Sequence, residues 1–374
     1  MDSVGEMKRR SVGGPKKECA KIEESDCNVR TDGSDDKKNR RFECRLIRYD
    51  ALPEYLKDNE FILDYYRSEW PLKEAFLSVF QWHNETLNVW THLGGFVLFL
   101  VLTVLSSMEI PEVREMISGF SRSIHAPLMK NISASFLPDH LMRFVLRDQT
   151  DHIMEPIARV PRWPWFIFLS GAMSCLACSS LSHLLTCHSR RMNLFFWRLD
   201  YAGISLMIVS SFFPPIYYAF LCYPLARIFY LSTIAIVGLV AILTLLTPAF
   251  SSPRFRPFRA LLFLTMGFFG VVPATHALLI NWDQPSCHAA LAYELLMGLA
   301  YAVGTGFYVS RVPERWWPGA FDLAGHSHQI FHVFVIAGAL AHYAATRVLM
   351  DWRDGGATCQ AYGGSTGLLS WLRL

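Results

Sequence analysis

Long apolar runs, separated mostly by short polar connections, make up the chain from residue 88 onward. Seven of these runs have about 18 residues or more and almost no charge, which is the length that a helix needs to cross a bilayer. They cover residues 88–105, 163–187, 199–220, 225–246, 259–280, 288–310 and 327–349. This pattern predicts an all-α membrane protein in which residues 88–349 form a bundle of seven transmembrane helices.

The polar segments outside the runs predict the two tails and one long loop. Residues 1–50 have mixed charge and no apolar period, so we expect a disordered tail without a cleavable signal peptide. Residues 106–162 form the long loop, in which a small helix is expected at 109–120. Residues 350–374 form a short C-terminal tail.

Between the first tail and the first run, residues 51–87 predict a juxtamembrane segment. Pro53 suits the first turn of a short helix, which we expect at 54–59. Further along, apolar residues recur at helical spacing over 72–80 beside charged ones. That arrangement is typical of an amphipathic helix that lies on a membrane surface.

Composition agrees with an integral, multi-pass membrane protein. The chain is 52% hydrophobic and 18% charged, whereas roughly 25% of residues are charged in soluble domains. The net charge of +3 is small, and we expect no nucleic-acid partner. The sequence leaves open whether the membrane is the plasma membrane or an endomembrane, and it leaves the oligomeric state open.

Arginine residues in the short loops predict the orientation. The loops after the second, fourth and sixth runs carry arginine, whereas those after the third and fifth carry neither lysine nor arginine. By the positive-inside bias, the N-terminus is then cytoplasmic, and the long loop and the C-terminus lie outside. On that outer side, the sequon at Asn131 is a candidate glycosylation site. Cys222, Cys287 and Cys359 are candidates for a disulfide, with the pairing left open.

Polar side chains inside the apolar runs gather at one depth. His328 and His332 lie four residues apart at the start of the seventh run, so a helix presents both imidazoles on one face. Ser179 and His183 lie at the cytoplasmic end of the second run, and Asp200 lies in the first turn of the third. Because polar groups inside a membrane are costly, this convergence indicates a functional site at the cytoplasmic end of the bundle.

Three histidines from two helices suit Zn²⁺. Three protein ligands plus water are typical of a catalytic zinc site, and bound zinc lowers the pKa of its water to about 7. Asp200 is then the candidate to orient or deprotonate that water, and Ser179 to donate a hydrogen bond beside it. In the alternative interpretation the histidines are packing residues, and Asp200 forms an ion pair with Arg198 or Arg191.

The start of the first run carries a second polar group. Glu85, Asn88 and His92 follow one another at intervals of three and four residues, which places them on one helical face. We interpret them as a hydrogen-bond network between helices that closes the bundle. The alternative is that they contact a substrate.

These residues resemble the motifs of the progestin and adipoQ receptor (PAQR) family, which comprises adiponectin-receptor-like seven-span proteins. The motifs lie at 52–59, 85–92, 179–183, 199–203 and 327–332, and the resemblance covers most of residues 51–349. The long outer loop is most similar to that of the plant heptahelical transmembrane proteins. The resemblance implies that His183, His328 and His332 hold Zn²⁺, that Asp200 holds the water on the zinc, and that Ser179 belongs to the same site.

Two functions follow from the residues and the resemblance together. The first is a receptor-like membrane protein in hormone, lipid or stress signalling, with the zinc site at its cytoplasmic end and an unidentified extracellular or lipid ligand. The alternative is a zinc-dependent lipid amide hydrolase, since the adiponectin-receptor branch is described as ceramidase-like; a membrane lipid is then the substrate. The polar residues concentrate at one end of the runs, which argues against a channel or transporter.

Overall fold

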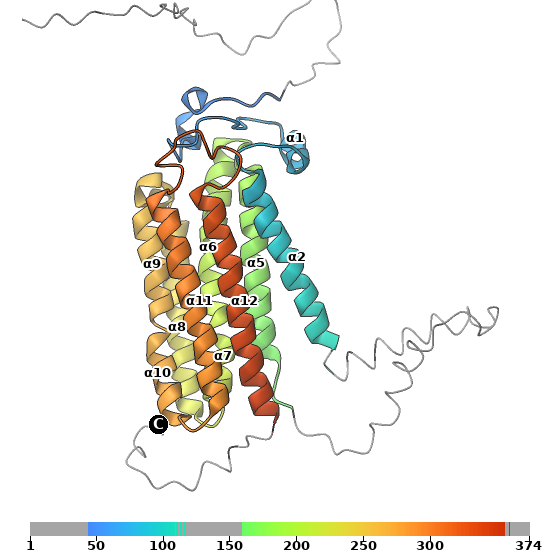
Figure 1. The fold of residues 1–374 in the computed structure, drawn as a ribbon, viewed down its shortest axis with the longest axis vertical. Coiled ribbons are helices and arrows are strands. Elements are labelled where there is room, and N and C mark those ends of the chain that lie inside the picture. Colours follow the sequence, from blue (N-terminus) through green and yellow to red (C-terminus); the bar gives the residue numbers. More distant parts are fainter. Residues whose placement is uncertain are drawn as a thin grey trace, which may run out of the picture. The chain divides into compact units, whose positions relative to one another are not determined.

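Seven long apolar helices lie side by side, as the hydrophobic pattern predicts (Figure 1). The computed structural model describes residues 44–108, 110, 113, 116, 159–355 and 359. Asn131 and most of the long loop, including most of the helix expected at 109–120, therefore lie outside the described residues. The spans are α2 (Thr86–Met108), α5 (Trp163–Leu185), α6 (Arg190–Ser211) with α7 (Phe213–Ala219), α8 (Pro224–Leu246), α9 (Arg256–Phe268) with α10 (Val271–Ile280), α11 (Pro285–Ser310) and α12 (Ser327–Asp354).

The third span begins at Arg190 rather than at residue 199. The side chain of Ser189 caps the helix by accepting a hydrogen bond from the backbone N–H of Met192 at 3.4 Å. Charged residues in the first turns lower the local hydropathy, so a hydropathy pattern places the start of the helix too late. Charged residues nevertheless form helices readily. Asp200 therefore lies about three turns inside the helix, and its expected place in the first turn was wrong.

Residues 44–85, which we call the strap, lie across the end of the bundle where α2 and α12 begin (Figure 1). We call this the strap end. In place of the helix expected at 54–59, the strap has a 3₁₀ turn at Glu54–Leu56. The amphipathic helix expected at 72–80 is α1 (Leu72–Leu77), followed by a 3₁₀ turn at Ser78–Phe80. It buries Ala75 completely, and it leaves Phe80 80% exposed.

Apolar and ionic contacts hold the strap on the bundle. Trp70 is only 3% exposed, and it packs in a cluster of buried residues from α2, α5 and α6. The carboxylate of Asp58 pairs with Arg256 of α9, and that of Glu60 pairs with Arg311, which follows α11. The strap is therefore bound to helices from both halves of the chain.

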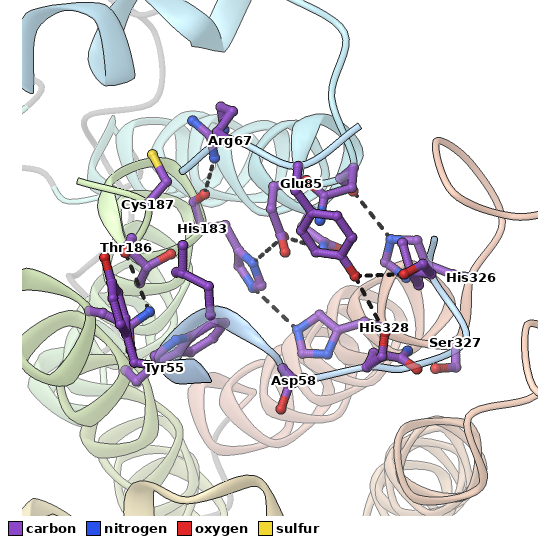
Figure 2. A pocket seen from close by; sticks show the side chains of 18 of the residues that line it. Tyr55, Asp58, Arg67, Glu85, His183, Thr186, Cys187, His326, Ser327 and His328 are labelled. Carbon is purple, nitrogen blue, oxygen red and sulfur yellow. Dashed lines mark hydrogen bonds and ion pairs between the residues drawn. The ribbon is translucent and has the colours of Figure 1, made fainter. Parts of the chain in front are cut away.

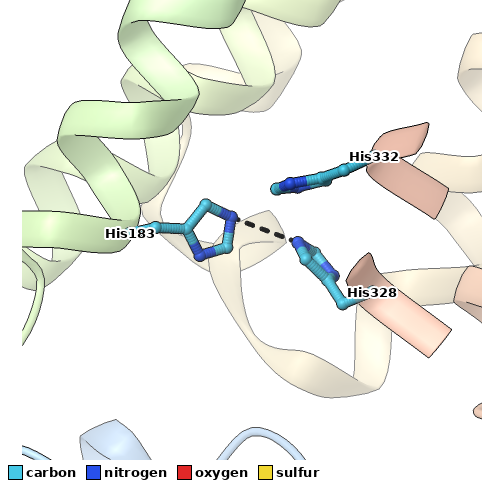
Figure 3. Close-up of side chains that lie close together, drawn as sticks. All are labelled: His183, His328 and His332. Carbon is cyan, nitrogen blue, oxygen red and sulfur yellow. Dashed lines mark hydrogen bonds between the residues drawn. The ribbon is translucent and has the colours of Figure 1, made fainter. Parts of the chain in front are cut away.

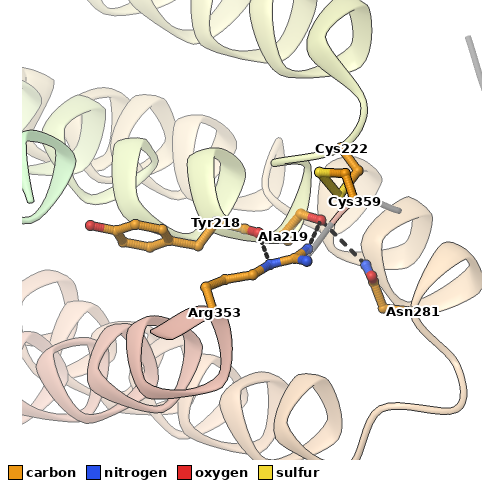
Figure 4. The surroundings of a disulfide bond; sticks show 6 residues. All are labelled: Tyr218, Ala219, Cys222, Asn281, Arg353 and Cys359. Carbon is orange, nitrogen blue, oxygen red and sulfur yellow. Dashed lines mark hydrogen bonds between the residues drawn. A yellow bond between two sulfur atoms is a disulfide. The ribbon is translucent and has the colours of Figure 1, made fainter. Parts of the chain in front are cut away.

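A disulfide joins Cys222 to Cys359 at the opposite end of the bundle (Figure 4). Cys287, the third candidate, is a buried free thiol. Nearby, the guanidinium of Arg353 donates hydrogen bonds to the backbone oxygens of Tyr218 at 2.7 Å and Ala219 at 3.0 Å. These bonds satisfy carbonyl groups at the C-terminal end of α7 and tie it to α12.

The disulfide predicts a labelling pattern for the unfolded chain. A maleimide should label two more thiols after reduction than before it. In the Cys222→Ser variant this difference should disappear, because Cys359 is then labelled without reduction. Cys287→Ser is the matched control, which should lower the count by one under both conditions. The same wild-type count with and without reduction would contradict the pairing.

A polar contact that the sequence left unexplained joins α11 to α12. Nδ1 of His342 lies 2.9 Å from a carboxylate oxygen of Glu294, and the His342 side chain is 1% exposed. Because each partner lies on a different span, neither residue by itself indicates the pair. His276 has a similarly structural partner, since its Nδ1 is 3.0 Å from the hydroxyl of Tyr230.

Candidate metal centre

Three histidines face one another between α5 and α12 (Figure 3). His183 lies in the last turn of α5, and His328 and His332 lie in the first two turns of α12. One ring nitrogen from each lies within 4.8 Å of the others. The Nε2 atoms of His183 and His328 are 3.2 Å apart. Imidazoles that converge in this way can hold a metal ion.

Two buried charged side chains hold the helix ends that carry these histidines. Arg67 of the strap donates from its guanidinium to the backbone oxygens of His183 at 2.7 Å and Leu184 at 2.9 Å. Glu314, which is fully buried, accepts a hydrogen bond at 2.7 Å from the backbone N–H of Ser327, the first residue of α12. Each contact satisfies orphan backbone groups at a helix end, and the Glu314 carboxylate also suits the helix dipole. Sequence reasoning missed both residues, because they lie in polar connections.

The Nδ1 atoms of two histidines have partners on the α2 side. Nδ1 of His183 lies 2.7 Å from the Glu85 carboxylate, which also accepts a hydrogen bond from Asn88 at 2.6 Å. Nδ1 of His332 lies 3.2 Å from the hydroxyl of Thr91. A partner on Nδ1 fixes the ring and leaves Nε2 for a metal ion.

His83 positions Glu85, and sequence reasoning did not find it. Burial and then the Arg67 guanidinium lower the pKa of His83 to about 3, so its ring is neutral at pH 7. Nδ1 accepts a hydrogen bond from the backbone N–H of Glu85 at 3.1 Å, and Nε2 donates to the backbone oxygen of Ser78 at 3.2 Å. A neutral ring is required, because one nitrogen accepts while the other donates.

His92 contacts the centre in a different way from Glu85 and Asn88. Its ring stacks on that of His332, with ring centroids 3.5 Å apart and planes at 15°. Neither of its ring nitrogens has a hydrogen-bond partner among the described residues. The polar face expected on α2 therefore divides into a hydrogen-bonded pair and a stacked ring.

Asp200 lies near the histidines without the ion pair that the alternative interpretation required. Its carboxyl is 5% exposed and accepts a hydrogen bond from Ser179. Its Oδ1 atom has no hydrogen-bond partner in the described part of the chain. Buried carboxylate oxygens require polar partners, so Asp200 is placed to accept a hydrogen bond from a water or ligand.

A small cavity opens beside His183 and His328, beneath the strap (Figure 2). Its volume is about 90 Å³, which accommodates several water molecules. Tyr55 and Asp58 line it from the strap, and Trp197 lines it from α6. Pockets for drug-sized ligands have roughly 300–1,000 Å³. With the strap in place, the cavity therefore admits water and excludes a lipid.

Comparison with known proteins matches most of the chain to membrane proteins. Residues 80–343 match the family described as Haemolysin-III related. Heptahelical transmembrane protein 3 of Arabidopsis thaliana is 56% identical over 318 residues, which cover 84% of this chain and 90% of the relative. Heptahelical transmembrane protein ADIPOR1 of Oryza sativa subsp. japonica is 51% identical over 328 residues, which cover 84% of this chain and 87% of the relative. The adiponectin receptor protein of Drosophila melanogaster is 35% identical over 305 residues, which cover 80% of this chain and 58% of the relative.

Proposed function

We propose that this chain, which belongs to the Haemolysin-III related family, is a receptor-type membrane protein whose three-histidine centre binds Zn²⁺. The matched family and relatives confirm the resemblance to adiponectin-receptor-like PAQR proteins and to the plant heptahelical proteins. The seven apolar spans make it an integral, multi-pass membrane protein. The similarity to the adiponectin receptor protein of Drosophila melanogaster supports a receptor, and the convergence of His183, His328 and His332 carries the proposal of zinc.

The distance between two ligand atoms supports zinc as the metal. In a tetrahedral site with Zn–N bonds of about 2.0–2.1 Å, two ligand nitrogens lie roughly 3.3 Å apart. The Nε2 atoms of His183 and His328 are 3.2 Å apart, which is close to that value. Imidazole ligands suit Zn²⁺, and the contacts from Glu85 and Thr91 to Nδ1 are those that metal-binding histidines usually have.

In a receptor, zinc would join α5 to α12 at the strap end. Arg67 and Glu314 connect the strap and the loop before α12 to the same two helix ends. A displacement of α12 relative to α5 would therefore move the strap, including its amphipathic part at 71–82. By the arginine distribution this end faces the cytoplasm, so such a movement would carry a signal from an extracellular or lipid ligand across the membrane.

Metal analysis of the purified full chain tests the zinc centre. We expect about one zinc ion per chain, as for other single-ion sites. Glu85→Gln should weaken zinc binding about 10–100-fold, because the carboxylate holds His183 in its ligand orientation. Glu54→Gln is the matched control, since its exposed carboxylate pairs with Lys57 and with no histidine among the described residues. Wild-type protein without zinc would overturn the proposal, and equal affinities for both variants would contradict the role of Glu85.

Asp200 supports a second candidate, a zinc-dependent lipid amide hydrolase. Zinc would act as a Lewis acid and make a water at the centre more acidic. Asp200, with Oδ1 unpartnered among the described residues, would accept the proton of that water. Ser179 would hold the carboxylate in place through its hydrogen bond. The strap would have to move aside to admit a lipid, because the cavity of about 90 Å³ is too small.

Asp200→Asn separates the two candidates. In a hydrolase it should lower kcat on ceramide-type amides in lipid nanodiscs by about 100-fold or more, as expected when a general base is lost. Zinc content should stay near the wild-type value, because Asp200 is not one of the grouped ligands. Asp351→Asn, with a 67% exposed side chain, is the matched control. A wild-type protein that holds zinc and hydrolyses no amide or ester lipid would exclude the enzyme and favour the receptor.

A further inference from the structure

An open groove lies on the side of α6 that faces away from the histidines. It measures about 440 Å³ and is lined by Arg191, Leu194, Phe195, Arg198, Leu199 and Leu246. The lining residues that belong to α6 are spaced by three, four or seven positions, so they share one face of the helix and form a stripe along it. Asn193, Trp197 and Asp200 occupy the opposite stripe, toward the metal centre. The groove therefore lies between α6 and the end of α8, at the strap end.

The wall of the groove is apolar and open to the surroundings of the bundle. Phe195 is 57% exposed, and Leu246, the last residue of α8, is 42% exposed. Leu194 and Leu199 are half-buried beneath them. In a membrane protein such side chains contact acyl chains, so the wall of the groove suits a hydrocarbon chain.

Two arginines in the groove lack an acidic partner. In the described ranges, no carboxylate forms an ion pair with Arg191 or Arg198, and Nε of Arg198 is buried without a hydrogen-bond partner. By contrast, Arg256 and Arg311 at the same end are each paired with a carboxylate of the strap. Arg191 and Arg198 lie seven residues apart, or roughly 10 Å along the helix. The groove thus offers two guanidinium groups at successive depths.

We propose that this groove binds a phospholipid with an anionic headgroup. The guanidinium groups of Arg191 and Arg198 suit phosphate oxygens, to which arginine donates paired hydrogen bonds. Phe195 and Leu246 contact an acyl chain of the same molecule. The groove lies at the end of a span, which is the depth of the lipid headgroups, and basic pockets between transmembrane helices at that depth bind acidic lipids.

Helix α6 separates the groove from the metal centre. Trp197, on the opposite stripe, packs edge-on against the ring of His183, with centroids 5.2 Å apart. A lipid in the groove packs against the side of α6 opposite the contact between Trp197 and His183. The groove is nevertheless separate from the histidines, so its occupancy does not depend on zinc.

Native mass spectrometry of the full chain tests the proposal, with phosphatidylglycerol and phosphatidylcholine of identical acyl chains as probes. Each arginine near an anionic headgroup contributes roughly a fivefold factor, so phosphatidylglycerol should bind about 25-fold more tightly. Arg191→Gln/Arg198→Gln should remove this preference. The control Arg254→Gln/Arg315→Gln removes the same charge from two exposed positions at this end, and it should keep the preference. Equal binding of both lipids by wild-type protein, or equal losses in both double variants, would overturn the proposal.

Two further measurements separate a phospholipid from a phosphate alone. Leu246→Trp fills the apolar wall and should weaken phosphatidylglycerol binding about tenfold, as the loss of packing for a hydrocarbon chain predicts. Soluble glycerol 3-phosphate should compete poorly at millimolar concentration. Unchanged binding in Leu246→Trp, or full competition by glycerol 3-phosphate, would show that the groove recognises the headgroup without the chain. An unchanged melting temperature of each variant establishes that it is folded.

Discussion

Alanine at both His328 and His332 is expected to abolish zinc binding by the purified full chain. The two side chains are two of the three ligands in the group, and the remaining His183 cannot hold the ion in competition with water. An ion that binds only the folded protein also stabilises it, by about 4 kcal/mol when free zinc exceeds the Kd 1,000-fold. The melting temperature of wild type should therefore fall when a chelator is added.

The double variant should respond differently to the chelator. Because it holds no zinc, its melting temperature should be the same with and without chelation. His288→Ala is the matched control, because His288 is exposed at the start of α11 and bonds to the backbone oxygen of Trp282. This control should keep zinc and the response to chelator. Zinc retained at the wild-type level by the double variant would disprove the ligand assignment.

Arg67→Met is expected to lower the free energy of unfolding by about 2–4 kcal/mol. The guanidinium is 3% exposed and donates to Ser78 and to the carbonyl groups of His183 and Leu184. Methionine keeps much of the volume but removes the guanidinium donor from the buried carbonyl of His183, and it leaves that of Leu184 with only the weak thiol donor of Cys187 at 3.7 Å. Loss of a buried hydrogen bond costs roughly 1–3 kcal/mol. Thermal unfolding in detergent should show a melting temperature several degrees lower. Zinc affinity should fall as well, because Arg67 holds the backbone of His183.

Arg48→Met makes the same substitution at an exposed place in the strap. The Arg48 side chain is 68% exposed and lies 3.9 Å from the carboxylate of Asp64. Exposed pairs of this kind contribute about 0–1 kcal/mol, so the melting temperature should change little. If Arg67→Met and Arg48→Met had equal stability, the strap would not be holding the end of α5.

Local patterns in the sequence predicted the spans and the histidine pair. In hydrocarbon a chain must satisfy its backbone hydrogen bonds internally, so seven apolar runs imply seven helices whatever their neighbours are. The helical period alone places His328 and His332 on one face. The start of α6 was missed, since hydropathy responds to Arg190 and Arg191 as charges and not to the cap at Ser189.

Contacts between distant residues were beyond such patterns. His83 and Glu314 lie in polar connections, where side chains are usually exposed, yet each is fully buried. The choice of Cys359 over Cys287 as the partner of Cys222 depends on how α7, α11 and the C-terminal segment meet. Glu294 had no interpretation until α11 and α12 were placed together.

The sequence by itself determined the membrane class, the existence of the seven spans and the face on which each polar residue lies, because these follow from hydrophobicity and the helical period. The tertiary structure alone decided which polar residues meet. It brought the ring of His183 within 3.2 Å of that of His328, and it placed the strap over these two histidines. It also left Asp200 without an ion pair among the described residues. Buried polar groups need partners, and many of those partners lie far away in the sequence, as Arg67 does from the carbonyl group of His183, so only the packed bundle could specify them.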